Sequence, residues 1–337
     1  MTAYNKQVRM PHLDSVELED WDFVPNLITQ SMEMSGRRCD AGEAAIFALQ
    51  LQHMRAQVLE RPYPELKARS LIPQQSEAPA GAEEIAYRIF DQVGMFELIT
   101  NYADDLPVTD IKGEKKIANI STFGGAVHYS IDEIERSTMA GLPIQQRKMQ
   151  SNRDAAERKF EQIAWLGELA SGQYGMLNHP NITKSTAATK AAGGTTWANA
   201  TAQEIYNDMV KPILQQINDT NGIESPDTIV LSPADYEKAN NTYFADVTGQ
   251  SAMKRFKEAY PEVTVEKCIY MKGNGAGSTN VLLAYRKDSN KVAMESPLPY
   301  TIEPPQMRNL ATIINARMKT AGVIAYFPLS ITVVEGL

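Results

Sequence analysis

Residues 143–171 read PIQQRKMQSNRDAAERKFEQIAWLGELAS, and this stretch predicts one long helix that organises the fold. Pro143 suits the first helical turn, where an N–H has no partner within the helix, and Gly172 follows the last helical residue. At 1.5 Å per residue the helix would be about 43 Å long. Its small and apolar residues form one narrow stripe, which consists of Met149, Ala156, Phe160, Ile163, Gly167 and Ala170. We therefore expect a helical spine that lies across a flat sheet or against other chains.

The composition describes an acidic chain with enough apolar residues for a sizeable core. Its 337 residues are 43% hydrophobic and carry a formal net charge of −8. This charge has the wrong sign for a protein whose main task is to grip phosphates. Cys39 and Cys268 lack the spacing of a disulfide framework or a zinc site, which fits a reducing compartment. Because no apolar signal segment or membrane span is present, we expect a soluble protein that is not exported.

Residues 1–66 are typical of an arm rather than of a separate domain. Polar residues dominate the first part, where Trp21 and Phe23 are candidates for anchoring the arm on another subunit. A capping box formed by Asp40 and Glu43 begins a predicted helix over residues 40–61.

Residues 84–120 predict a long antiparallel hairpin without a core of its own. Ile85, Tyr87 and Ile89 alternate with polar residues in the first strand. Ile111 and Ile117 are their expected apolar counterparts in the second strand. The charged candidates for contact with another subunit are Arg88, Asp91, Asp104, Asp105, Asp110, Lys112, Glu114, Lys115 and Lys116. A hairpin without a core is marginal in water, so it must lean on another surface.

Strands and helices alternate after the predicted spine, which indicates a compact α/β unit. A capping box at Thr201 and Glu204 begins its first helix, and helices are also expected from Ser232 and over residues 251–260. Strands are predicted over residues 228–231, 263–265, 269–271 and 281–285, with a hairpin from the last of these into 292–295. The C-terminal region predicts strands over residues 312–318, 323–327 and 331–334.

The sequence offers no catalytic, cofactor-binding or metal-binding residues. The glycines at 273, 275 and 277 precede a strand and lack a following GK[ST], so they favour a flexible turn over a phosphate cradle. On a strand, the adjacent residues Asp104 and Asp105 would point to opposite faces, which favours an ionic role over acid–base chemistry. The histidines have no second ligand at i+3 or i+4; they are His12, His53, His128 and His179. We therefore predict that the protein is not an enzyme.

Five short segments carry a more specific signal. They are ARSLIP at 68–73, AYRIFDQVG at 86–94, NYADDLP at 101–107, YSIDEI at 129–134 and GMLNHPN at 175–181. With the order of the predicted elements, they resemble the major capsid proteins of tailed bacteriophages, which have the Hong Kong 97-type shell fold. The resemblance lies in the amino-acid sequence itself over residues 68–181, and in the order of the predicted elements over the later segments.

The resemblance implies an α+β fold with four parts. Residues 1–66 would form an N-terminal arm, and residues 67–200 an extended loop, at about 84–120, together with a peripheral domain whose spine helix spans 143–171. Residues 201–305 would form the axial domain, and residues 306–337 would return as strands of the peripheral domain.

The resemblance also implies a function. The chain would be a structural protein that assembles in the host cytoplasm into hexamers and pentamers of an icosahedral virion head. Its partners would be copies of itself, a scaffolding protein, a portal and a decoration protein. Packaged double-stranded DNA would make only weak, non-specific contacts with its acidic lining, and no membrane or cofactor would be involved.

Two alternatives remain open at this point. An encapsulin-like bacterial compartment shares the fold but encloses cargo enzymes, and its cargo-peptide pocket would distinguish it. A more distant alternative is a cytosolic α/β enzyme with a site around Asn178 and His179, which would need a nucleophile or ligand cluster.

Overall fold

A computed structural model describes residues 63–94, 109–139, 144–245 and 249–337 of the chain. The chain divides into two units, residues 1–63 and 64–337, and the described elements belong to the second. The predicted arm, the helix at 40–61 and the candidates Trp21, Phe23, Asp104 and Asp105 lie outside the described residues.

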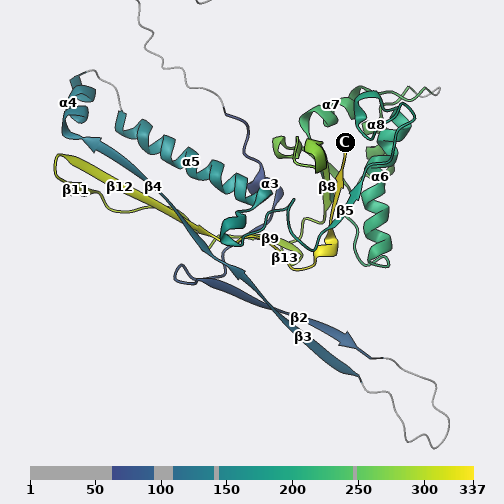
Figure 1. Cartoon of the computed structure of the whole chain (residues 1–337), viewed down its shortest axis with the longest axis horizontal. Coiled ribbons are helices and arrows are strands. Elements are labelled where there is room, and N and C mark those ends of the chain that lie inside the picture. Colours follow the sequence, from purple (N-terminus) through teal and green to yellow (C-terminus); the bar gives the residue numbers. More distant parts are fainter. Residues whose placement is uncertain (1–62, 95–108, 140–143, 246–248) are drawn as a thin grey trace, which may run out of the picture. The chain divides into compact units, whose positions relative to one another are not determined.

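The predicted hairpin is confirmed as a two-stranded antiparallel ribbon. Strand β2 spans Glu84–Val93, and β3 spans Asp110–Asn119. The two strands pair in continuous register from Glu84 opposite Asn119 to Val93 opposite Asp110. Figure 1 shows this ribbon running away from the helices and from the other sheets of the unit.

A four-stranded sheet follows the ribbon, and the spine helix lies along it. Strand β4 (Ser121–Ser130) pairs antiparallel over its whole length with β12 (Ala311–Thr320). Strands β10 (Leu298–Ile302) and β11 (Gln306–Arg308) pair with β12 on its other edge. Helix α4 (Ile131–Met139) follows β4, and α5 (Ile144–Leu166) packs along β4, as Figure 1 shows. The sheet supplies the flat surface that the narrow apolar stripe predicts.

The spine helix ends earlier than the sequence predicts. Helix α5 stops at Leu166 rather than Ser171, because Gly167 adopts a φ of 70° while its N–H still donates to the Ile163 carbonyl at 2.9 Å. A side chain at residue 167 would approach the Gln173 carbonyl oxygen to 2.5 Å, so only glycine fits this tight turn. Residues Leu169–Ser171 form a separate 3₁₀ turn, η2, before the predicted stop at Gly172.

A small sheet connects the hairpin and the spine to the rest of the unit. Its strand order is β1 (Gln74–Gln75), β9 (Val292–Glu295) and β13 (Gly322–Ala325). The predicted hairpin between residues 281–285 and 292–295 is therefore wrong. Both strands exist, but β9 pairs with β1 and β13 because the chain crosses into a different sheet.

The α/β unit contains a five-stranded mixed sheet. Its order is β5 (Thr183–Thr186), β14 (Ile331–Glu335), β8 (Val281–Tyr285), β6 (Thr228–Leu231) and β7 (Thr264–Lys267). Its helices are α6 (Ala202–Asp219), α7 (Pro233–Asn241) and α8 (Ala252–Ala259). The predicted capping box is present, since the Thr201 side chain accepts from the Glu204 N–H and the Glu204 carboxylate accepts from the Thr201 N–H.

Strand pairing differs from the segment boundaries that the sequence predicts. Strands β5 and β14 belong to the α/β sheet although they lie outside residues 201–305, whereas β10 lies within that range and joins the sheet of β4. The final strand, β14, thus pairs with β5 and β8 and not with the spine's sheet, whereas β11 and β12 of the predicted returning strands do join that sheet. Residues Ile269–Met271, expected as a strand, form a 3₁₀ turn, η4. The other short helices are α3 (Ala68–Leu71), η3 (Trp197–Asn199), η5 (Ala276–Ser278) and η6 (Pro328–Ser330).

Two hydrophobic cores lie on opposite faces of the five-stranded sheet. Val333 and Leu283 face a core that includes Phe160 and Trp165 at the end of the spine. Val334 and Leu282, the next residues along the same strands, face a core shared with α6 and α8. This alternation is the period of two expected for a strand buried on both faces. Within the described ranges, no helix is both long and apolar enough to cross a bilayer.

Candidate functional site

The hairpin has two faces that differ in exposure. On the inner face Ile85, Tyr87 and Ile89 are each half-buried, and the Tyr87 ring meets the Tyr326 ring edge-on at a centroid distance of 5.1 Å. This aromatic pair joins β2 to the residue after β13. The inner face therefore rests on its own subunit.

The root of the hairpin packs beside His179. This side chain lines a cavity of about 250 Å³ together with Lys116 of β3 and Tyr174, whose ring lies edge-on to the imidazole at 5.4 Å. Burial, and then the charge of Lys116, lower the pKa of His179 below its usual value. The imidazole is held in its neutral form, which suits packing against a lysine.

The outer face of the hairpin exposes apolar side chains. Phe90, Ile111 and Ile117 are 65%, 61% and 52% exposed. The register corrects the predicted pairing of apolar residues across the strands, because Ile117 lies opposite Ala86 and Ile111 opposite Gln92. The isoleucines of β3 therefore face away from Ile85, Tyr87 and Ile89, and both of their side chains are more than half exposed.

Basic residues accompany this apolar surface. Arg88 lies directly opposite Lys115 on the outer face, and two like charges in this position repel each other. An acidic side chain on a partner surface would reduce this repulsion and stabilise the contact. We name the surface of Arg88, Phe90, Ile111, Lys115 and Ile117 the outer hairpin face.

The remaining charged candidates share the inner side of the ribbon. Asp91 lies opposite Lys112, and Glu114 forms a 3.8 Å ion pair with Lys116. Asp110, the first residue of β3, lies opposite Val93 on the same side. The structure thus divides the predicted charged candidates between two faces, which residue types alone do not reveal.

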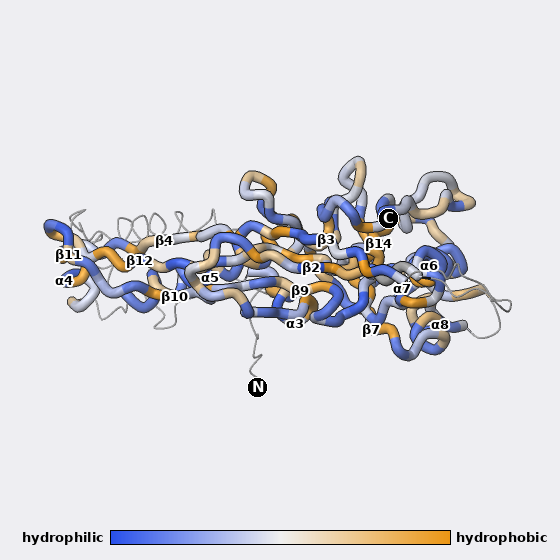
Figure 2. The backbone as a smooth tube through the Cα atoms, turned by 90° about the horizontal axis from the view of Figure 1, so that it is seen from below, coloured by the Kyte–Doolittle hydropathy of each residue, from blue (hydrophilic) through white to orange (hydrophobic). Residues whose placement is uncertain are grey.

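A second exposed apolar group lies at the far end of the spine's sheet. It consists of Ile131 and Met139 on α4, Met307 on β11 and Leu310 in the turn before β12. The Ile131 N–H donates to the Leu310 carbonyl at 3.1 Å, which holds α4 against this turn. Figures 1 and 2 place α4 and β11 at the same end. We name this group the distal patch, which the sequence prediction missed because its members are scattered through the chain.

The residues around His179 do not form a catalytic arrangement. Both polar groups of the Asn178 side-chain amide form hydrogen bonds with the backbone, because Oδ1 accepts from the Gly175 N–H and Nδ2 donates to the Leu166 carbonyl. Burial raises the pKa of the Cys268 thiol to about 11, so this cysteine is a poor nucleophile. The described part of the chain contains no group of three or more His, Cys, Asp or Glu side chains that is suited to a metal.

Comparison with known proteins decides the family. The family model for the major capsid protein matches residues 94–337. The chain belongs to the major capsid protein family. It is a phage capsid protein, a structural component of the virion shell that associates with copies of itself. No curated protein sequence matches the chain significantly.

Solved capsid structures share the fold of this capsid protein. The capsid of Myoviridae phage XM1 aligns with a TM-score of 0.76 at 17% identity, over 86% of this chain and 98% of that one. A structure from Mycobacterium phage Ogopogo aligns with a TM-score of 0.60 at 13% identity, over 86% of this chain and 98% of that one. The capsid of cyanophage P-SCSP1u aligns with a TM-score of 0.59 at 13% identity, over 87% of this chain and 94% of that one. These likenesses confirm the Hong Kong 97-type fold that the sequence predicts.

Proposed function

We propose that the subunit forms the hexamers and pentamers of an icosahedral head that encloses double-stranded DNA, and that the outer hairpin face lies on a neighbouring subunit. The exposure of Phe90, Ile111 and Ile117 on a ribbon without its own core carries this proposal. In this view residues 84–120 are the extended loop, the spine and its sheet are the peripheral domain, and the five-stranded sheet with its helices is the axial domain.

The energetics favour such a role for the hairpin. Fully burying an apolar side chain of this size stabilises a complex by about 1.5–3 kcal/mol. Three such side chains on every subunit, repeated around a closed ring, give a large total from individually modest contacts. An acidic partner surface would also relieve the repulsion between Arg88 and Lys115.

The distal patch is the second proposed contact. It lies at the opposite end of the sheet from the small sheet of β1, β9 and β13, as Figure 1 shows. One subunit therefore carries two separate apolar surfaces, and a closed shell requires each subunit to contact several neighbours. We propose that Trp21, Phe23, Asp104 and Asp105 belong to further subunit contacts.

The remaining partners follow from the same role. We propose assembly in the host cytoplasm with a scaffolding protein, a portal and a decoration protein. The formal net charge of −8 supports weak, non-specific contact with packaged DNA, because an acidic lining does not bind phosphates tightly.

The test is assembly of the full chain, followed by light scattering and negative-stain electron microscopy. The double variant Arg88→Glu with Lys115→Glu should weaken each contact about tenfold, which is roughly 1.4 kcal/mol, so the yield of shells or capsomer rings should fall by at least that factor. Lys257→Glu with Lys272→Glu, at two exposed lysines outside both surfaces, is the control with the same change in net charge. Equal assembly of the double variant and the control would refute the proposed contact.

A further inference from the structure

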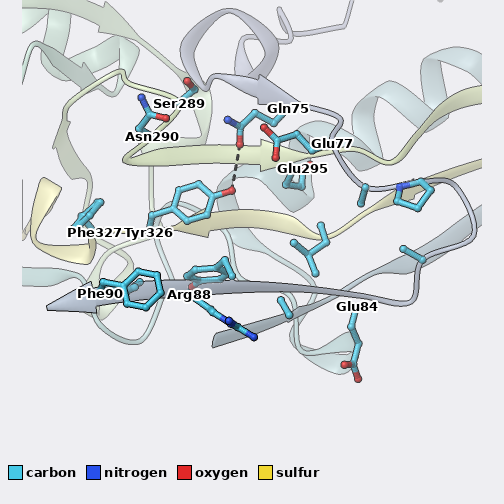
Figure 3. A pocket seen from close by; sticks show the side chains of 17 residues that line it. Gln75, Glu77, Glu84, Arg88, Phe90, Ser289, Asn290, Glu295, Tyr326 and Phe327 are labelled. Carbon is cyan, nitrogen blue, oxygen red and sulfur yellow. Dashed lines mark hydrogen bonds between the residues drawn. The ribbon is translucent and has the colours of Figure 1, made fainter. Parts of the chain in front are cut away.

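A groove of about 710 Å³ lies between β2 and the small sheet of β1, β9 and β13. Figure 3 shows its floor, where Tyr326 donates a hydrogen bond of 3.2 Å to Oε1 of Gln75. Glu77 and Glu295 lie along the same wall in the figure, one from the segment after β1 and the other from the end of β9. The groove thus gathers two carboxyl groups and an amide oxygen.

Glu295 is the unusual member of this group. It is only 2% exposed, and its Oε2 atom is buried without a hydrogen-bond partner. Burial and then the Glu77 charge raise the pKa of Glu295, although the Glu77 N–H opposes them. An unpartnered buried carboxylate oxygen is costly unless a charge or a proton compensates it.

The other deeply buried acidic residues of the described chain have a basic partner or at least two hydrogen-bond donors, although Oε2 of Glu224 also lacks a hydrogen bond and has only Arg286 at 3.7 Å. Glu161 accepts from three N–H groups, Asp208 pairs with Lys190, and Glu224 pairs with Lys291. Asp235 accepts from Ser232 and Asn280. For Glu295 no lysine or arginine of the described ranges fills this role, and Arg88, which also lines the groove, points away from both carboxyl groups in Figure 3.

We propose that this groove binds a hard divalent cation, Mg²⁺ or Ca²⁺, between Glu77 and Glu295. Carboxylate and amide oxygens are the ligands that both ions prefer, and Mg²⁺ is commonly held by one or two carboxylates with water completing its shell. The open groove has room for that water. A proton would neutralise only one of the two carboxylates, whereas a divalent cation neutralises both.

A bound cation would tie the segment after β1 to the end of β9. Glu77 is exposed, whereas Glu295 is fixed in a strand that pairs with β13 at Gly322. The ion would thus hold the segment that leads into β2 against the body of the subunit. It would act as a clamp at the base of the hairpin.

The experiment is calorimetric titration of the full-length protein with MgCl₂ and, separately, CaCl₂ after removal of metals with EDTA, together with melting curves in each state. We expect about one site per chain, a raised melting temperature with cation, and binding weakened at least about tenfold by Glu295→Gln and by Glu77→Gln, since each removes one ligand charge. Glu83→Gln, at an exposed neighbour that does not line the groove, should bind as the wild type does. Glu77→Gln keeps the test valid if Glu295→Gln does not fold.

Three outcomes would overturn the proposal. One is the absence of cation binding together with an unchanged or raised melting temperature in Glu295→Gln, which would mean that Glu295 is held protonated. Another is the absence of binding together with failed assembly of Glu77→Gln, which would mean that a basic side chain of a second copy supplies the charge. The third is binding that neither variant weakens, because the ion would then lie elsewhere.

Discussion

The backbone N–H of Ala68 donates a 2.8 Å hydrogen bond to Oε2 of Glu161, a carboxylate buried near the end of the spine helix. The other oxygen of Glu161 accepts from the Lys67 N–H at 2.9 Å and from Nε1 of Trp165 at 2.8 Å. One side chain thus satisfies the first N–H groups of α3 and fixes the largest ring of the adjoining core. It joins the segment that precedes the hairpin to the spine.

Replacing Glu161 by alanine should destabilise the subunit strongly. Three donors lose their acceptor, two of them buried and one partly buried, and each buried unsatisfied donor costs about 1–3 kcal/mol. We expect the free energy of unfolding to fall by about 3 kcal/mol or more in urea denaturation of unassembled subunits. Glu157→Ala, which removes an exposed 2.9 Å ion pair with Arg69, should cost less than about 1 kcal/mol. Similar losses in the two variants would contradict the role assigned to Glu161.

The buried pair of Lys190 and Asp208 should show strong coupling. Both side chains are almost fully buried, and Asp208 also accepts from Nε1 of Trp197 at 2.7 Å. Asp208→Asn leaves a buried lysine without its counter-charge, so it should cost about 3–5 kcal/mol. Adding Lys190→Met removes the uncompensated charge and should recover a large part of that loss. A double-mutant cycle measured by denaturation checks this, and strict additivity would exclude the coupling.

Stability should depend on pH through His179. Because its pKa is lowered in the folded state, first by burial and then by Lys116, the unfolded chain binds the proton more readily. The folded state therefore loses stability as pH falls below the unfolded value near 6.5, and this loss is absent above it. His179→Gln should flatten the decline in the free energy of unfolding between about pH 7 and pH 5. A decline as steep in the variant as in the wild type would contradict this role of His179.

Polar substitutions in the distal patch should affect assembly rather than folding. Met307→Ser with Leu310→Ser changes two exposed side chains, so the free energy of unfolding should stay within about 0.5 kcal/mol of the wild type. Shell yield should fall, because the proposed contact loses apolar area. Sedimentation of assembly mixtures measures this yield. Normal shells would show that the patch makes no stabilising contact.

Patterns local in sequence predicted much of the fold. The alternation in residues 84–120 correctly predicted the two-stranded ribbon, and Thr201 with Glu204 correctly predicted the start of α6. Both patterns depend only on interactions between residues close in sequence. The end of the spine depended on the positive φ of Gly167 and its close approach to Gln173, six residues later, which the apolar periodicity does not reveal. The sequence pattern continues past this turn, so the predicted helix was too long.

Strand partners and surfaces needed the three-dimensional structure. Val292–Glu295 forms a strand as expected, but its partners Gln74–Gln75 and Gly322–Ala325 are distant in sequence. The burial of Glu295 follows from that pairing and could not be read from the residue type. Likewise, the register alone decides that Phe90 and Ile117 share the outer hairpin face.

An electron cryomicroscopy reconstruction of shells assembled from the full chain tests the proposed hairpin contact most directly. The account predicts that Phe90, Ile111 and Ile117 are covered by an adjacent subunit and that acidic side chains of that subunit lie near Arg88 and Lys115. Shells in which the outer hairpin face stays open to solvent, or folds back onto its own subunit, would contradict it.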